Sequence, residues 1–452
     1  MLLIRIKKLR SRLKMCRAVF PVGFVALFYV IASATAADAD ARTPVMGWST
    51  WTTFKCNINE TLILSSINAL AGNGFVRAGY DTVLIDDCWS APRDASGAIQ
   101  IDHSRFPRGF APLIAFARNL GIRMGIYTSV GETTCAGFTG SLGFEEQDAA
   151  TFHAWGFDFV KHDTCVDMNC TVRNGCIQNA TRRMRDALYR VSDGQMTYYL
   201  DAGNPSNEMK LYNPKGHGVQ SMDGSIATSA EQLAWRWATE LDDPAEVKGQ
   251  SRGPHMIKAM WDIKDTWLNT LMNVHALIRV APYHACDHAI TPDMLTVGMG
   301  AQTLAQYRAQ FFLWAVLGAP LILSNDIRTI DSDALALVTN PEVIDIDQDA
   351  DCVMGSLVSA KGSGETWIRP LADGSFAVVL LNKDLSRAQN ITLLIAKSAG
   401  QWGDFFPVVF ADTQQMAIRD VGARIDLGNF NQTFTATVGP TDAVMLRVTA
   451  LE

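Results

Sequence analysis

Short β-rich runs alternate with amphipathic stretches over the first two thirds of this chain, and this alternation restricts the fold most. We predict eight strands, at Val45–Trp48, Thr82–Asp86, Arg123–Thr128, Phe157–Lys161, Met196–Asp201, Leu233–Trp237, Ala276–Pro282 and Pro320–Ser324. Helical periodicity predicts helices between them, at Glu60–Asn73, Phe110–Leu120, Phe144–Trp155, Asn179–Ser192, Met256–Asn269 and Thr303–Leu317. Eight strands separated by helices favour a (β/α)8 TIM barrel over an open sheet. No G-x-G-x-x-G motif follows the first strand, which argues against a dinucleotide-binding fold.

The pattern changes after Asp349, where alternation of apolar and polar residues replaces helical periodicity. The strands predicted there are Trp367–Arg369, Phe376–Asn382, Asn390–Ile395, Val408–Phe410 and Ala443–Val448. Asp373-Gly374 is a hairpin turn signal between two of them. We therefore predict an α/β chain of two domains, with the barrel over 42–349 and an antiparallel β-sandwich over 350–452.

A basic N-terminal segment precedes an apolar run from Ala18 to Ala32, and Ala34-Thr35-Ala36 then offers a cleavage site for a signal peptidase. The run is short for a membrane span and contains Pro21 and Gly23. We predict a cleaved secretory signal over 1–36, with an uncleaved signal anchor as the alternative. The mature protein is then expected to be secreted, or to reside in a lysosomal or other endomembrane lumen.

The cysteines agree with export. Of nine cysteines, Cys16 falls in the predicted signal, and the others form an even set that suggests several disulfides in an oxidising compartment. The spacing of Cys170 and Cys176 suggests a local bridge, and without partner histidines it gives poor support for a zinc site. Five glycosylation sequons support the same route; they start at Asn59, Asn169, Asn179, Asn390 and Asn431.

Composition narrows the ligand class. With 48% hydrophobic and 19% charged residues, the chain is typical of a globular protein and not of a disordered one. A net charge of -7 argues against nucleic acid as a partner and fits a neutral ligand.

One predicted strand runs directly into charged residues. The segment Phe157–Cys165 places Lys161 and Asp163 two residues apart, hence on the same face of the strand. Charged groups at the end of a buried strand commonly lie at the mouth of a barrel, where ligands bind. Two readings are open: a barrel-mouth salt bridge, or a nucleophilic carboxylate that the ammonium group holds ionised.

Other predicted strands also end in polar or aromatic residues. The set comprises Trp48, Trp51, Asp86, Asp87, Tyr127, Lys161, Asp163, Asp201, Arg236 and Glu240. The adjacent carboxylates of Asp86 and Asp87 suit hydrogen bonding to sugar hydroxyls, although a helix N-cap is the alternative. Trp51 and Trp89 offer flat apolar faces of the kind that pack against a pyranose ring. Together these residues predict a sugar-binding site at the C-terminal ends of the strands.

The chain resembles glycoside hydrolase family 27, the α-galactosidases and α-N-acetylgalactosaminidases. The resemblance rests on ordered motifs from about Thr43 to Asp349, which are Met46-Gly47-Trp48-x-x-Trp51, Cys56, Ile85-Asp86-Asp87-Cys88-Trp89, Arg105-Phe106-Pro107-x-Gly109, Gly125-Ile126-Tyr127, Thr134-Cys135-Ala136-Gly137, Lys161-x-Asp163-x-Cys165 and Ser324-Asn325-Asp326-Ile327-Arg328. The C-terminal region resembles the family's second domain in type and position only.

The resemblance implies roles for individual residues. Asp163 is expected to be the nucleophile that forms a covalent glycosyl-enzyme, and no metal or other cofactor is implied. The residues expected to line the sugar subsite are Trp51, Asp86, Asp87, Tyr127 and Lys161. The resemblance also implies the disulfides Cys56–Cys88 and Cys135–Cys165, the second of which fixes the loop after the nucleophile. Cys286 and Cys352 are left over, and a bridge between them stays open.

The general acid/base is harder to identify. The family uses an Asp four residues after an Arg, in the pattern Trp-Arg-x-x-x-Asp-Ile. Trp235-Arg236 aligns with this pattern and places Glu240 at the position of the Asp, one methylene longer. We predict Glu240 as the acid/base, with Asp242 as the fallback and Arg236 in the substrate site.

Two further loops depart from the family pattern. Asp201 and Asn204 stand where the family's 2-position recognition loop lies, and an acidic residue there favours a free 2-hydroxyl group over a 2-acetamido group. The segment from His284 to Leu295 keeps Asp293, a predicted substrate-binding residue, but lacks the Trp-Asn-Asp that precedes it in the family. His284 and His288 are read as loop residues and not as metal ligands.

The sequence therefore predicts a retaining α-glycoside hydrolase, most simply an α-galactosidase acting on a glycan with a terminal α-galactosyl-type sugar. Another activity of the family is the first alternative, such as α-N-acetylgalactosaminidase or β-L-arabinopyranosidase. A catalytically impaired sugar-binding protein is the second alternative, because the acid/base position is altered. The sequence is compatible with a homodimer and does not decide between a monomer and a homodimer.

Overall fold

The structure, a computed structural model, describes residues 43–165, 176–202, 254–258, 260–279, 281, 284–394, 415–431 and 433–451. The predicted signal over 1–36 and the predicted strands Leu233–Trp237 and Val408–Phe410 lie outside these residues. None of the helices in the described part of the chain combines the length and apolar character that a membrane crossing demands.

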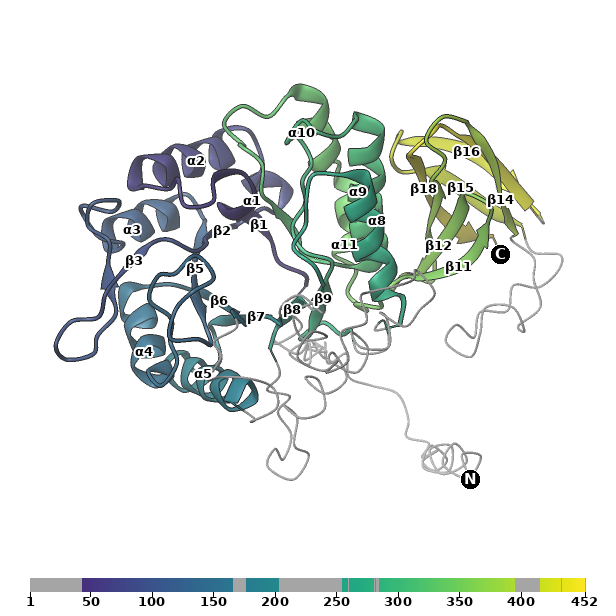
Figure 1. The fold of residues 1–452 in the computed structure, drawn as a ribbon. Coiled ribbons are helices and arrows are strands. Elements are labelled where there is room, and N and C mark those ends of the chain that lie inside the picture. Colours follow the sequence, from purple (N-terminus) through teal and green to yellow (C-terminus); the bar gives the residue numbers. More distant parts are fainter. Residues whose placement is uncertain are drawn as a thin grey trace, which may run out of the picture. The chain divides into compact units, whose positions relative to one another are not determined.

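Eight parallel strands form the predicted barrel (Figure 1). In chain order they are β1 (Met46–Ser49), β2 (Thr82–Ile85), β5 (Arg123–Ser129), β6 (Phe159–Asp163), β7 (Thr197–Asp201), β8 (Met256–Lys258), β9 (Ala289–Thr291) and β10 (Leu321–Leu323). Their order in the sheet is β10-β1-β2-β5-β6-β7-β8-β9. A parallel bridge between Leu295, just after β9, and Leu323 of β10 joins the two edges and closes the barrel. The (β/α)8 prediction is confirmed.

Helices follow the strands and cover the barrel (Figure 1). They are α1 (Trp51–Phe54), α2 (Glu60–Gly72), α3 (Ala111–Asn119), α4 (Glu145–Trp155), α5 (Cys176–Ser192), α8 (Trp267–Ala276), α9 (Leu304–Leu317), α10 (Ser332–Val338) and α11 (Pro341–Asp347). Side-chain caps lie at the N-termini of several helices. Asn59 accepts a hydrogen bond from the backbone N–H of Leu62, and Thr303 forms a capping box with Gln306 at the start of α9. Short connections contain the 3-10 turns η2 (Val76–Ala78) and η3 (Leu277–Arg279) and the small hairpin of β3 (Ser90–Ala91) and β4 (Gln100–Ile101).

Two predictions in the second half of the barrel are wrong. The predicted helix Met256–Asn269 begins as strand β8, and the predicted strand Ala276–Pro282 is the end of α8 followed by η3. The strand next to β8 is instead β9. Both β8 and β9 are only three residues long, which is too short for periodicity to distinguish a buried strand from a helix. The start of α8 has a local signal, since Thr266 accepts a hydrogen bond from the backbone N–H of Asn269.

The C-terminal region is the predicted antiparallel β-sandwich. Its strands are β11 (Ser356–Lys361), β12 (Gly364–Pro370), β13 (Phe376–Asn382), β14 (Gln389–Leu394), β15 (Met416–Asp420), β16 (Ile425–Phe430), β17 (Thr433–Val438) and β18 (Asp442–Ala450). One sheet has the order β11-β12-β13-β18-β15-β16, and the other pairs β14 with β17. Inward residues of both sheets, such as Val378 and Phe434, share one apolar core. At the turn between β12 and β13, Gly374 has a positive φ of 81°, as the Asp373-Gly374 signal predicts.

Barrel and sandwich pack directly against one another. Helix α9 contacts β13 and β18, and the apolar core of the barrel continues into residues of the sandwich such as Trp367 and Met445. The guanidinium group of Arg369, buried on β12, donates hydrogen bonds to the carbonyl oxygens of Ala315 (3.0 Å) and Ile346 (2.7 Å). These bonds satisfy carbonyl groups at the C-terminal ends of α9 and α11, which lack partners within their helices.

Three disulfides lie wholly within the described residues. Cys56–Cys88 and Cys135–Cys165 are the pairs that the family resemblance implies. Cys286–Cys352 is the pair that the sequence left open. Cys176 is also disulfide-bonded, and its predicted partner Cys170 lies outside the described residues. Several disulfides in one chain are typical of proteins that fold in an oxidising compartment.

Asp347, at the end of α11, gives the fold a pH dependence that can be measured. Burial raises the pKa of its carboxyl group to about 8, with Arg369 opposing the shift. The folded state therefore holds a proton that the unfolded state releases near pH 4. The contribution of Asp347 to stability is complete below about pH 4 and is lost as the pH rises towards 8.

We expect Asp347→Asn to flatten the fall in melting temperature between pH 5 and pH 8, because asparagine carries no titrating proton. The measurement is thermal unfolding across this pH range. Asp345→Asn, on the same helix and with a side chain that is 63% exposed, is the matched control and should leave the slope unchanged. A slope that is identical in Asp347→Asn and the parent protein would contradict the assignment.

Candidate active site

Strand β6 places its charged residues on two different faces. Lys161 and Asp163 point into the mouth of the barrel, while His162 between them points outward, where its Nδ1 lies 3.0 Å from the hydroxyl oxygen of Tyr198 on β7. That hydroxyl group also contacts the carbonyl oxygen of Thr181 on α5, so His162 belongs to the layer between sheet and helix. Burial lowers the pKa of His162 to about 3, which keeps this imidazole neutral. The alternation predicted for Lys161 and Asp163 is confirmed.

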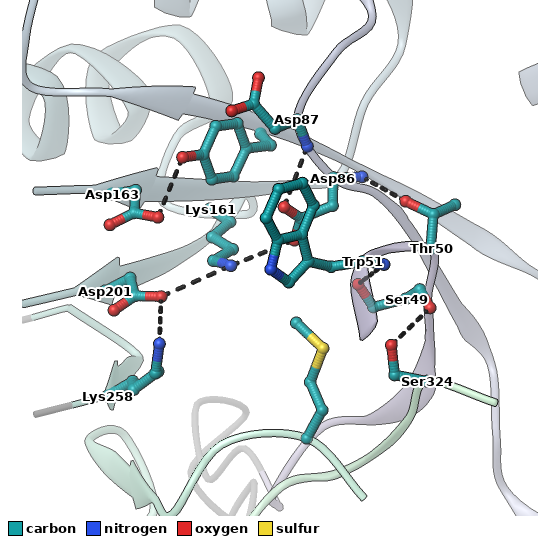
Figure 2. Close-up of polar contacts among 12 residues, drawn as sticks. Ser49, Thr50, Trp51, Asp86, Asp87, Lys161, Asp163, Asp201, Lys258 and Ser324 are labelled. Atoms are coloured by element: carbon teal, nitrogen blue, oxygen red, sulfur yellow. Dashed lines mark hydrogen bonds and ion pairs between the residues drawn. The ribbon is translucent and has the colours of Figure 1, made fainter. Parts of the chain in front are cut away.

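Two lysines connect the carboxylates of the barrel mouth (Figure 2). The Nζ of Lys161 lies 3.1 Å from Asp86 and 3.5 Å from Asp201. The Nζ of Lys258, at the end of β8, lies 3.0 Å from Asp201 and 3.6 Å from Asp293, and also pairs with Asp262. We call these residues, Asp86, Lys161, Asp201, Lys258, Asp262 and Asp293, the charge network.

Most of the charge network is buried. The side chains of Asp86, Lys161, Asp201 and Lys258 are each at most 4% exposed, whereas that of Asp262 is 73% exposed. Burial acts to lower the pKa of Lys258, but the carboxylates of Asp201, Asp293 and Asp262 outweigh it and raise this pKa well above its usual range. Lys161 behaves in the same way through Asp86, Asp201 and Asp163. Both lysines are therefore fixed cations at any working pH, and they offset the clustered negative charge.

Asp163 is held by its immediate neighbours. The hydroxyl group of Tyr127 on β5 donates a 2.9 Å hydrogen bond to Asp163 Oδ2 and lies 3.2 Å from Cys165 Sγ. The Cys135–Cys165 disulfide closes the loop on the other side, with Cys135 Sγ 4.0 Å from the same carboxylate oxygen. Cys135, Asp163 and Cys165 have the spacing of a metal cluster, but both sulfur atoms are oxidised in the disulfide and offer no thiolate ligand.

The electrostatics of Asp163 differ from the prediction that Lys161 holds this carboxylate ionised. Lys161 forms its close ion pairs with Asp86 and Asp201 instead. Burial is the largest influence and raises the pKa of Asp163, Asp201 adds to it, and the charges of Lys161 and Lys258 only partly offset the rise. The pKa of Asp163 therefore lies well above its usual range.

The adjacent carboxylates Asp86 and Asp87 have separate tasks. Asp86 binds Lys161 inside the charge network, whereas Asp87 accepts hydrogen bonds from the backbone N–H groups of Cys88 and Ala136, the latter at 2.9 Å. Asp87 thus fixes the loop that carries Cys135, and burial raises its pKa. Trp51 follows β1 and is partly exposed beside Asp86 and Lys161, as Figure 2 shows. Trp89 is instead a core residue, whose indole N–H donates to the carbonyl oxygen of Tyr127.

Glu240, Asp242 and Arg236, predicted to supply the acid/base and a substrate contact, lie outside the described residues, as does Asn204. Asp293 does reach the site. It follows β9 with a positive φ of 84°, and its carboxylate accepts a 2.8 Å hydrogen bond from the backbone N–H of Ile263. Burial raises its pKa against the opposing charge of Lys258.

Sequence reasoning missed Lys258 and Asp262. Both belong to the segment predicted as a helix, so their position at the end of a barrel strand was not foreseen. A signal was nevertheless present, because Lys258-x-x-x-Asp262-Ile263 repeats the spacing of Arg-x-x-x-Asp-Ile with lysine in place of arginine. The charge of Lys258 lowers the pKa of Asp262, and partial desolvation of the carboxylate opposes this shift.

Comparison with known proteins agrees with this geometry. Residues 43–349 match the family model described as "Alpha galactosidase A", and residues 361–448 match the "Alpha galactosidase C-terminal beta sandwich domain". The chain is 33% identical over 364 residues to alpha-galactosidase A of Cellvibrio japonicus, covering 79% of this chain and 80% of that one. It is 30% identical over 427 residues to human alpha-galactosidase A, with 90% and 89% covered. The crystal structure of alpha-galactosidase I from Mortierella vinacea superposes with a TM-score of 0.74 at 27% identity, covering 91% of this chain and 98% of that one.

The charge network predicts a pH-dependent loss of stability when its central cation is removed. Lys161→Met leaves Asp86 and Asp201 facing one another without the ammonium group between them. Removing one partner of a buried ion pair costs about 3–5 kcal/mol, so we expect a loss of this order in the free energy of unfolding at pH 7.5. At pH 5 the loss should be smaller, because protons can replace the missing charge.

Denaturant unfolding at both pH values measures this difference. Arg123→Met is the matched control, since the ion pair of Arg123 with Asp81 is exposed on both sides and should be worth under about 1 kcal/mol. An equal loss for Lys161→Met at pH 5 and pH 7.5 would show that packing, and not charge, is what Lys161 supplies.

Proposed function

Because the chain belongs to the α-galactosidase family, glycoside hydrolase family 27, we propose that it is a retaining glycosidase that releases terminal α-linked galactose. The observation that carries the proposal is the arrangement around Asp163. This carboxylate is bound by Tyr127 at the barrel mouth, and a second, exposed carboxylate, Asp262, is joined to the same site through its ion pair with Lys258. A double-displacement glycosidase requires two carboxyl groups at the scissile bond, one as the nucleophile and one as the acid/base.

In the first step, Asp163 attacks the anomeric carbon from one face of the sugar. The bond to the leaving oxygen breaks as a carboxylic acid donates its proton to that oxygen, and a covalent glycosyl-enzyme remains. In the second step, the same carboxylate, now ionised, removes a proton from water, and the resulting oxygen nucleophile displaces Asp163 with net retention. Tyr127 keeps the Asp163 carboxylate oriented for attack, since its hydrogen bond fixes one of the two oxygens.

We assign the acid/base role to Asp262 and not to Glu240. Asp262 has the sequence context Lys-x-x-x-Asp-Ile, and its side chain is 73% exposed, so that a leaving group can reach it. Its ion pair with Lys258 fixes its position relative to Asp201 and Asp293. With an aspartate in this place, the reason to suspect a catalytically impaired sugar-binding protein no longer applies.

The opposite pKa shifts of the two carboxyl groups have a consequence for the pH profile. Catalysis needs Asp163 ionised and Asp262 protonated, yet burial raises the pKa of Asp163 and Lys258 lowers that of Asp262. The productive form is therefore a minor state of the free enzyme, and the two limbs of the pH profile belong to the pair of carboxyl groups. Substrate binding excludes water and changes this balance in the complex.

The surroundings of Asp201 support galactose over its 2-acetamido derivative. Asp201 is buried, and its carboxylate is bound by both lysines of the charge network. The described residues on this side of the site are charged and hydrogen-bonding, which suits a hydroxyl group better than an acetamido methyl group. A panel of aryl glycosides of α-galactose, α-N-acetylgalactosamine and β-L-arabinopyranose tests this preference directly.

We also propose that the protein works outside the cytoplasm, in a secretory or lysosomal lumen or after secretion. Three described disulfides support this location, as do the sequons at Asn59, Asn179, Asn390 and Asn431, each of which is exposed.

The catalytic assignments predict different products when azide replaces the missing carboxylates. With an aryl α-galactoside and azide, Asp262→Ala should form α-galactosyl azide, since azide attacks the glycosyl-enzyme and the configuration is retained. Asp163→Ala should form β-galactosyl azide. Azide then enters the space that the carboxylate vacated and displaces the aryl group in a single step, which inverts the configuration at the anomeric carbon. NMR of the products distinguishes the two. Asp262→Ala should also slow disaccharide cleavage by about 100- to 10,000-fold, and activated aryl substrates less.

Glu240→Ala is the control for these assignments and should retain disaccharide cleavage. If Glu240→Ala, and not Asp262→Ala, yields α-galactosyl azide, then the original alignment of Glu240 is right and the assignment of Asp262 is wrong. No hydrolysis of any aryl α-galactoside by the parent protein would contradict the proposed function itself.

The charge of Lys258 should determine the pH values at which activity rises and falls in the pH profile. Its charge lowers the pKa of Asp262 and of Asp163, so Lys258→Met raises both values. Both limbs of the kcat/KM profile, which belong to the pair of carboxyl groups, should therefore move to higher pH. Lys258→Arg keeps the charge and should keep the parent profile, whereas unshifted limbs in Lys258→Met would exclude this role.

A further inference from the structure

A lysine outside the charge network shares the open side of the site. Lys55 follows α1, and its Nζ lies 4.6 Å from the centre of the Trp51 ring, within the range of a cation–π contact. The charged groups that act on it are Asp262, Asp86, Asp293 and Lys161, with Asp262 first among the carboxylates. Asp86 and Asp293 are buried, whereas Lys55 and Asp262 are exposed. Lys55 and Asp262 are therefore both exposed, and their charges lie close enough to interact.

The backbone holds Lys55 at this place. It has a positive φ of 48° with ψ of -127°, a conformation that favours glycine and that other residues adopt at a cost. Its N–H donates a 2.9 Å hydrogen bond to the carbonyl oxygen of Trp51, and the next residue, Cys56, is bound to Cys88. Lys55 thus occupies a position where glycine would adopt the backbone conformation without strain. The hydrogen bond to Trp51 and the disulfide of Cys56 hold its backbone in place.

The charge of Lys55 is not used by an ion pair within the described part of the chain. The salt bridges there pair Lys161 and Lys258 with the carboxylates of the site, and none of them includes Lys55. Burial lowers the pKa of Lys55, and the carboxylates of Asp262, Asp86 and Asp293 oppose the shift and favour the ammonium form. An exposed ammonium group over the ring of Trp51 is available to a ligand.

We propose that Lys55 lies in the aglycone subsite and selects α-galactosides whose leaving group carries an anionic substituent, a carboxylate or a phosphate. The inference rests on the proposed function and extends it. Asp262 protonates the leaving oxygen, so the aglycone lies beside Asp262, where the charge of Lys55 also acts. A cation there attracts a negative substituent on the leaving group.

The test uses two substrates that differ only in the charge of one substituent on the phenyl leaving group. These are 4-carboxyphenyl α-D-galactoside and its methyl ester, and the quantity is the ratio of their kcat/KM values. In Lys55→Met this ratio should fall about fivefold, the size expected of a partly exposed ion pair. Lys55→Arg should keep the parent ratio. A carboxylate in the meta position and a phosphate in place of the carboxylate report how far the subsite reaches and which anion it prefers.

Two controls separate a binding role from other effects. Lys361→Met removes one exposed charge from β11 in the sandwich and should leave the ratio unchanged. Lys55→Gly removes the charge and relaxes the backbone, so it should fold with an equal or higher melting temperature while the ratio falls as in Lys55→Met. Raising the salt concentration to about 0.5 M should bring the parent ratio close to that of Lys55→Met.

If Lys55 acted only by adjusting the proton affinity of Asp262, the kcat/KM values of both substrates would change by the same factor and their ratio would stay the same. An unchanged ratio in Lys55→Met, with both substrates still cleaved, overturns this proposal and leaves the proposed function standing. Failure of the parent protein to cleave either substrate overturns the proposed function instead.

Discussion

The structure depends on one electrostatic constraint, the burial of several carboxylates at the mouth of a barrel. Asp86, Asp201 and Asp293 come from different strands and would repel one another in a site from which water is largely excluded. Lys161 and Lys258 make the arrangement stable, because each ammonium group is shared by at least two carboxylates. The same arrangement fixes the two groups proposed to react, since the lysine charges act on both Asp163 and Asp262.

Covalent and hydrogen-bonded supports hold the loops around this network. The Cys135–Cys165 disulfide lies against the proposed nucleophile, and Asp87 binds the backbone beside Cys135. Cys56–Cys88 connects the loop after β1 with the loop after β2, which places Trp51 and Lys55 next to Asp86. The two sides of the site therefore differ in kind. The sugar side is buried and held by ion pairs, while Lys55 and Asp262 are exposed, and this is where preference for a leaving group can arise.

The sequence predictions were best where the local pattern was long or had a cap, although β10, which is only three residues long, was also foreseen within Pro320–Ser324. Strands β1, β2, β5, β6 and β7 and helices α2 to α5 were foreseen closely, because each has four or more residues of clear periodicity or a cap such as Asn59. The strands β8 and β9, of three residues each, were missed, and with them the positions of Lys258 and Asp262. The missed strand thus hid a second candidate for the acid/base, since Lys258 and Asp262 also satisfy the pattern with which Glu240 was aligned.

The sequence by itself determined the barrel, the sandwich and the proposed nucleophile. Strand alternation places Lys161 and Asp163 on one face, and the C-terminal ends of parallel strands meet at one rim. Only the tertiary structure decided which charges pair. Lys161 binds Asp86 and Asp201 and not Asp163, Cys286 bonds to Cys352, and Lys55 lies over the ring of Trp51. The physical reason is that pairing depends on distances between residues far apart in the chain, which closure of the barrel fixes and local patterns do not contain.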